Sequence, residues 1–75
     1  MASQRDLQAR LARLAGRVAE TEDRVADVLD ELASRGGDLE AARRARAGAA
    51  RQFAREERAM SAIYQRQASG APASA

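Results

Sequence analysis

The sequence predicts an all-α protein: an antiparallel two-helix coiled-coil hairpin that dimerises into a four-helix bundle. Three observations support this prediction. Apolar residues recur at heptad spacing through two long segments, a Gly-Gly pair separates the segments, and 75 residues allow only one small domain. Alanine supplies 20 of these residues, and Phe53 and Tyr64 are the only aromatic ones, so bulky core material is scarce.

The first predicted helix covers residues 3–35. Ser3 is a favourable N-cap, and Asp6 three residues later completes a variant of the capping box. The pair Gly36-Gly37 ends the helix, because glycine readily takes the left-handed cap conformation. Apolar residues follow a strict 4-3 spacing with one polar exception, Thr21. The repeating positions are Leu7, Leu11, Leu14, Val18, Thr21, Val25, Val28 and Leu32.

The second predicted helix covers residues 38–67 after the turn at 36–37. Asp38 is the expected N-cap, and Gly48 inside the helix costs about 1 kcal/mol relative to alanine. Residues 1–2 are predicted to be disordered, as is the small, polar and proline-interrupted tail 68–75. The seam of this helix is weaker than the first. Its positions are Leu39, Ala42, Arg46, Ala49, Phe53, Glu56, Met60 and Ile63.

The two seams predict a single register. If Leu32 faces Ala42, paired residue numbers sum to 32 + 42 = 74, and Thr21 faces Phe53. The acidic stretch 20–31 then lies beside the basic stretch 43–54. The residues predicted to form the core between the helices are Leu7, Leu11, Leu14, Val18, Val25, Val28, Leu32, Phe53, Met60 and Ile63.

A second, alanine-rich flank predicts self-association. One seam rarely stabilises a chain below about 70–80 residues, and a four-helix dimer is the usual remedy. Small residues beside the first seam would let another helix approach closely. The alternative is that alanine simply favours helix on an exposed face. The predicted self-association residues are Ala15, Ala19, Ala26, Leu29 and Ala33.

Two charged stripes are candidate partner-binding surfaces. The arginine stripe suits phosphates of a nucleic acid or an acidic protein, although it includes no aromatic residue to stack on bases. The acidic stripe is expected at the same level on the opposite outer side, where it could meet a complementary partner. The alternative for both is ordinary solvation. The stripes are Arg44, Arg51, Arg55 and Arg58, and Glu20, Asp23, Asp27 and Asp30.

Composition excludes several function classes. The chain has no Cys, His or Lys, which removes thiol nucleophiles, histidine bases and the usual metal sites. We therefore expect a protein that is not an enzyme and that uses no cofactor or metal. All 13 basic residues are arginine, and the net charge is only +2, which is low for a general nucleic-acid binder. No segment resembles a membrane span or a signal peptide, so we expect a cytoplasmic location.

The Ala- and Arg-rich two-helix plan resembles, over residues 3–67, small helical-hairpin proteins of GC-rich bacteria, including regulators that sequester a partner along a coiled-coil face. Among them, cyclic-dinucleotide-binding anti-sigma hairpins carry a Glu-x3-Ser-x2-Arg-x3-Gln-x3-Asp run. Glu57 and Ser61 match its opening, but Tyr64 and Ala68 replace its Arg and Gln. We therefore do not carry over that function. We expect a protein-interaction module whose partner is a second copy of the chain or another protein. The alternatives are a nucleic-acid-binding regulator and an amphipathic protein that folds at a membrane surface.

Overall fold

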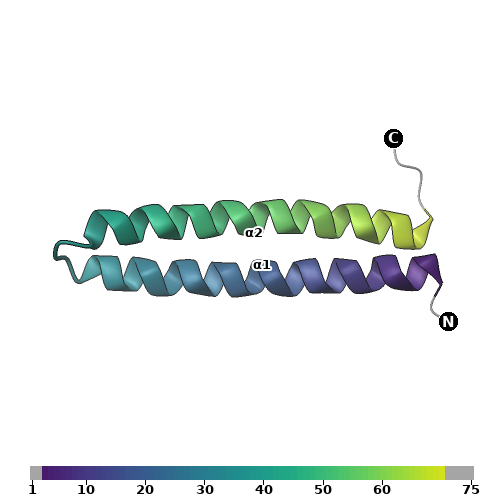
Figure 1. The fold of residues 1–75 in the computed structure, drawn as a ribbon, viewed down its shortest axis with the longest axis horizontal. Coiled ribbons are helices and arrows are strands. Elements are labelled where there is room, and N and C mark those ends of the chain that lie inside the picture. Colours follow the sequence, from purple (N-terminus) through teal and green to yellow (C-terminus); the bar gives the residue numbers. More distant parts are fainter. Residues whose placement is uncertain (1–2, 71–75) are drawn as a thin grey trace.

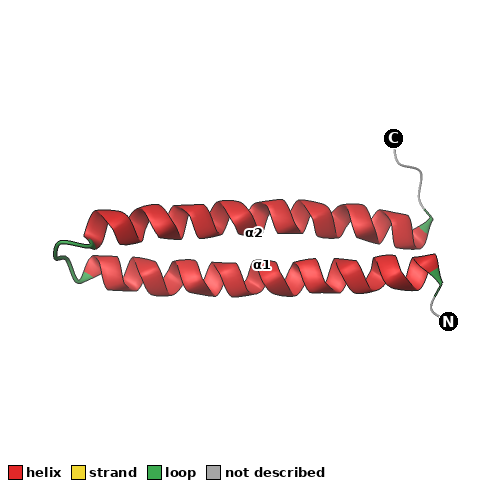
Figure 2. Cartoon of the chain, in the orientation of Figure 1, coloured by secondary structure: helices red, strands yellow, loops and turns green. Residues whose placement is uncertain are grey.

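The protein is a single antiparallel pair of long helices, as predicted. The computed structural model describes residues 3–70, so the predictions for residues 1–2 and 71–75 lie outside the described part. Helix α1 (Gln4–Ser34) and helix α2 (Glu40–Ser69) lie side by side, joined at one end by a short turn (Figures 1 and 2). The pair measures 52 × 29 × 12 Å, so it is one helix thick.

The start of α1 matches the sequence prediction. The Ser3 hydroxyl accepts a hydrogen bond from the Asp6 N–H at 3.1 Å, and the Asp6 carboxylate accepts one from the Ser3 N–H at 3.2 Å. This is a complete capping box, which satisfies N–H groups that the helix itself cannot pair. Gly36 and Gly37 have φ angles of 76° and 96°. These values favour glycine and confirm the predicted turn.

The start of α2 differs from the prediction. Leu39, not Asp38, is the residue before the helix, and no side chain caps it. A backbone hydrogen bond from the Glu40 N–H to the Gly37 carbonyl, at 3.2 Å, closes the turn instead. The glycine pair therefore brings the chain directly into α2. At the other end α2 continues to Ser69, two residues beyond the prediction, and stops at Gly70, whose φ is 73°.

Small residues form the contact between the two helices. Eight alanines are buried, several of them completely, and no large side chain is fully buried in residues 3–70. The Ser61 hydroxyl also crosses this contact and donates a 2.8 Å hydrogen bond to the Ala12 carbonyl. The buried alanines are Ala12, Ala15, Ala19, Ala26 and Ala33 in α1 and Ala47, Ala50 and Ala54 in α2.

The axial register agrees with the prediction, whereas the rotation of the helices does not. Ala12 lies opposite Ser61, a sum of 12 + 61 = 73, and Ala26 packs against Ala47, also 26 + 47 = 73. Both values are within one residue of the predicted 74. However, each helix turns its alanines, rather than its Leu and Val seam, toward the other. Within residues 3–70 neither helix has a stretch apolar enough to cross a lipid bilayer.

Candidate protein-interaction surface

The large apolar residues lie on the surface of the hairpin. The prediction that they form the core between the helices is wrong, because nine of the ten are exposed and the tenth, Leu32, is half-buried. The exposed fraction is 36% for Ile63 and reaches 55% for Val28. The other seven exposed residues are Leu7, Leu11, Leu14, Val18, Val25, Phe53 and Met60.

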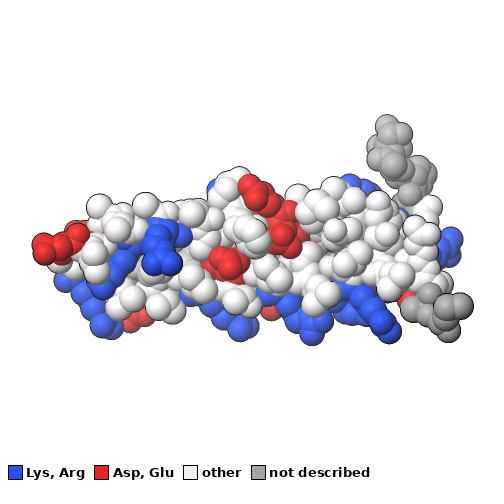
Figure 3. All heavy atoms as spheres, in the orientation of Figure 1, with Lys and Arg blue, Asp and Glu red and all other residues white. Residues whose placement is uncertain are grey.

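These exposed residues of the two helices meet on one side of the hairpin. Val25 of α1 and Ala49 and Phe53 of α2 line a common groove. We call this side the apolar face and define it by the eight seam positions of each helix named above. All sixteen are exposed except Leu32. Figure 3 shows a largely uncharged face, with arginine atoms gathered along its α1 edge and a few acidic atoms near its middle.

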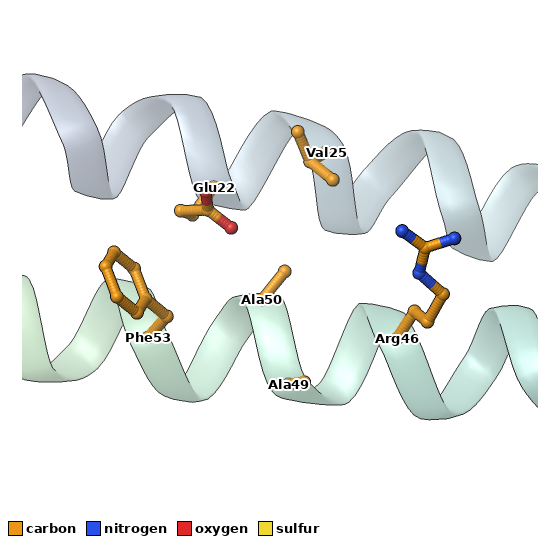
Figure 4. Close-up of a pocket in the computed structure, with 6 residues that line it drawn as sticks. All are labelled: Glu22, Val25, Arg46, Ala49, Ala50 and Phe53. Carbon is orange, nitrogen blue, oxygen red and sulfur yellow. The ribbon is translucent and has the colours of Figure 1, made fainter.

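A few charged side chains interrupt the middle of the apolar face. In Figure 4 the Arg46 guanidinium extends from α2 toward α1, and the Glu22 carboxylate points from α1 into the groove above Phe53. None of the ion pairs found within residues 3–70 includes Arg46 or Glu56. The Glu56 carboxylate accepts only a 3.2 Å hydrogen bond from the Gln52 amide, one turn earlier on the same helix.

The two charged stripes lie together on a different side of the hairpin. The expectation that they occupy opposite outer sides is wrong, because their members form ion pairs across the helix contact. Arg51 of α2 reaches Asp30 at 2.6 Å and Asp27 at 3.2 Å in α1. Arg58 likewise pairs with Asp23. Turning the alanines inward places the acidic flank of α1 beside the basic flank of α2, which explains the pairs.

The arginine stripe is partly neutralised by these contacts. The hydrogen bond to Asp30 raises the pKa of Arg51 above its ordinary value, and the nearby charges of Asp30 and Asp27 add to the effect. Arg44 pairs with Glu40 on its own helix at 3.2 Å. The Arg55 guanidinium donates to the Gln52 side chain. Three of the four arginines therefore already face a carboxylate, which weakens the stripe as a phosphate-binding surface.

The remaining stripe residue, Glu20, is exposed near Arg17 beside a second shallow groove. Carboxylates bind hard cations when several converge on one point. Within residues 3–70 no group of three or more acidic side chains is arranged to hold a metal ion. The described acidic side chains of the stripe serve mainly as partners for arginine.

The alanine flank that was predicted to bind a second chain lies inside the hairpin. Ala19, Ala26 and Ala33 have no exposed surface, Ala15 is 5% exposed, and Leu29 packs against the same cluster. They are buried against α2 and are therefore not accessible to a second chain. The sequence contained the signal, since Ala12, Ala15 and Ala19 follow the same 3-4 spacing as the adjacent leucines. Comparisons with protein-family models, with curated proteins and with solved structures find no match.

Proposed function

We propose that this protein is a small, non-catalytic assembly module that self-associates through its apolar face. The observation that carries the proposal is the exposure of nearly every large apolar side chain on a folded hairpin. Soluble monomers rarely leave a continuous apolar surface of this kind uncovered, and such surfaces mark interaction sites. The coiled-coil spacing of these residues makes another pair of helices a suitable cover.

The energetics favour covering the face. Fully burying a Val, Leu, Ile, Phe or Met side chain stabilises by about 1.5–3 kcal/mol. Ten large apolar residues of the hairpin are between 36% and 56% exposed to solvent. Burying that remainder contributes about 1 kcal/mol each, or roughly 20 kcal/mol for two chains. This exceeds the about 4–15 kcal/mol that association costs in lost freedom of motion.

The hairpin alone, by contrast, has little to hold it together. Its buried core consists of alanine methyl groups, and each buried methyl contributes only about 0.8 kcal/mol. No disulfide can supplement this core, because the chain has no cysteine. A second layer of helices over the apolar face would supply the large buried side chains that the single layer lacks.

The nucleic-acid alternative depends on the arginine stripe. Arg44, Arg51 and Arg58 are each paired with a carboxylate of the same chain. Binding phosphates there would require breaking these pairs. The pairing therefore favours the assembly role.

Light-scattering mass on size-exclusion chromatography tests the proposal at roughly 0.05 M and 1 M salt, between which electrostatic screening differs strongly. We expect twice the chain mass of 8.0 kDa at both salt concentrations, because the contact is apolar. The variant Leu14→Glu, on the apolar face, is expected to shift the protein toward monomer. The matched control Ala45→Glu, at an exposed position outside that face, leaves the mass unchanged.

A wild-type protein that stays helical and monomeric would refute self-association. An oligomer that dissociates in 1 M salt would refute self-association through the apolar face, because that behaviour indicates association through charges.

A further inference from the structure

The exposed positions of α2 repeat symmetrically about residue 51. Pairs whose numbers sum to 102 place Phe53 against Ala49, the bulkiest residue of the row against a small one. The same sum places Arg46 against Glu56, the two opposite charges of the row. The remaining pairs are apolar: Leu39 with Ile63 and Ala42 with Met60. A two-fold axis through residue 51 would therefore match size and charge together.

We propose that a second copy of this chain covers the apolar face, with the two hairpins antiparallel about a two-fold axis at the height of residue 51. This inference rests on the proposed function and specifies its partner and geometry. Arg46 then lies opposite the partner's Glu56, and Glu56 lies opposite the partner's Arg46. Helix α2 stacks on α2 of the partner, and α1 stacks on its α1.

The seam of α1 fits the same axis. Residues whose numbers sum to 73 or 74 lie at one height along the hairpin, so height 51 on α2 corresponds to residue 22 or 23 on α1. For residue 23, pairs across the axis on α1 sum to 46. These pairs are Leu14 with the partner's Leu32, Val18 with the partner's Val28, and Thr21 with the partner's Val25. With residue 23 at the axis, these seam residues of α1 therefore face apolar residues of the partner, and Leu11 faces the partner's Arg35 at the edge.

The charges exclude two other face-to-face arrangements. A parallel dimer, with both turns at one end, stacks α1 on the partner's α2 at equal heights. It places Arg46 over the partner's Val28 and Glu56 over the partner's Val18. A fully overlapped antiparallel dimer, with its axis near residue 54.5 of α2, places Arg46 over the partner's Ile63. Either arrangement desolvates charged groups against apolar side chains without pairing them, which is unfavourable.

The selected arrangement gives Arg46 the ion pair that it lacks within residues 3–70. Glu22 lines the same groove as Arg46 and lies close to the axis, so it can offer a second carboxylate. Arginine suits this position because its guanidinium can bind carboxylates in a fixed, planar geometry. The offset of the axis from the middle of the hairpin leaves Leu7 beyond the partner's turn.

Charge exchange tests the pairing. In a homodimer of the Arg46→Glu variant or of the Glu56→Arg variant, positions 46 and 56 carry the same charge. Each homodimer therefore contains two repulsive contacts. Each substitution is expected to weaken self-association at least about tenfold in sedimentation equilibrium. Mixing the two variants brings opposite charges together at both sites, so a heterodimer should dominate. Native mass spectrometry separates it from the homodimers by mass. Both positions are exposed in the hairpin, and circular dichroism checks that the helices persist.

A distance measurement fixes the orientation. The chain has no cysteine, so Asp38→Cys near the turn carries one spin label per copy. From 1.5 Å of rise per residue, the proposed axis separates the two labels by about 40 Å along the bundle. The fully overlapped antiparallel dimer gives about 50 Å, and a parallel dimer gives less than about 20 Å.

The outcomes separate this inference from the proposed function. A dimer with labels about 40 Å apart and a dominant mixed-charge heterodimer support the inference. A dimer with either of the other distances, or one indifferent to both charge changes, overturns the inference while self-association stands. A wild-type monomer overturns both.

Discussion

Exchanging Ala26 for leucine provides the sharpest test of which helix faces meet. Ala26 has no exposed surface and packs against Ala47 and Ala50 of the opposite helix. The additional three carbon atoms of leucine have no space there unless the helices separate. Alanine and leucine have similar helix propensities, so the change acts through packing rather than through the helix itself.

The magnitude follows from the closeness of this contact. Inserting methylene groups into a filled core costs about 1–3 kcal/mol. We therefore expect Ala26→Leu to lower the free energy of unfolding by about that amount. The matched control Ala45→Leu lies on the exposed outer surface of α2 and should change stability by less than about 0.5 kcal/mol.

Urea unfolding followed by circular dichroism measures both variants, at one protein concentration because the proposed association would contribute to stability. The slope of the unfolding free energy against urea concentration should be the same for the wild type and both variants. If Ala26→Leu is as stable as Ala45→Leu, or more stable than wild type, the alanine rows do not face each other. In that case the Leu and Val seam would be the intramolecular contact, and the assembly surface proposed here would be wrong.

Four further predictions concern the turn, the interior of α2, the first helix end and the ion pairs. Gly36→Ala should destabilise by about 1 kcal/mol because its φ is 76°. Gly48→Ala, in open space within α2, should stabilise by about 0.5–1 kcal/mol in the same urea assay. Ser3→Ala removes the capping box and should cost about 0.5–2 kcal/mol. Arg58→Gln breaks an exposed pair and should lower the melting temperature only slightly, with the difference vanishing in 1 M salt.

Sequence reasoning succeeded where local chemistry decides the outcome. The capping box at Ser3 and the turn at Gly36 depend on residues a few positions apart. The axial register was also predicted to within one residue. A turn built on two glycines leaves only a few residues between the end of the first helix and the start of the second, and this limits how the helices can be aligned. The N-cap at Asp38 failed for a related reason, since a backbone turn closed by Gly37 made a side-chain cap unnecessary.

The rotation of the helices could not be settled in this way. In α1 most seam residues are followed directly by a buried alanine, as in Leu11-Ala12 and Leu14-Ala15, so the seam and the buried alanines share one heptad period. Periodicity identifies the spacing of the residues in a helix contact, but it does not show which of two adjacent rows faces the other helix. That choice depends on contacts between the helices, such as the ion pair of Arg51 with Asp30, which form in only one rotation of the helices about their axes.

The same two rows explain how a chain this short would act as the proposed assembly module. Alanines allow the helices of one chain to approach closely, and Ala19, Ala26 and Ala47 have no exposed surface in this contact. The larger side chains, such as Leu14 and Phe53, then remain outside, where only another layer can bury them. A chain with the rows exchanged would bury its large residues internally and present alanines, whose burial contributes much less to association. In the proposed assembly, placing the small residues inside and the large ones outside would therefore shift the apolar stabilisation from folding of one chain to association.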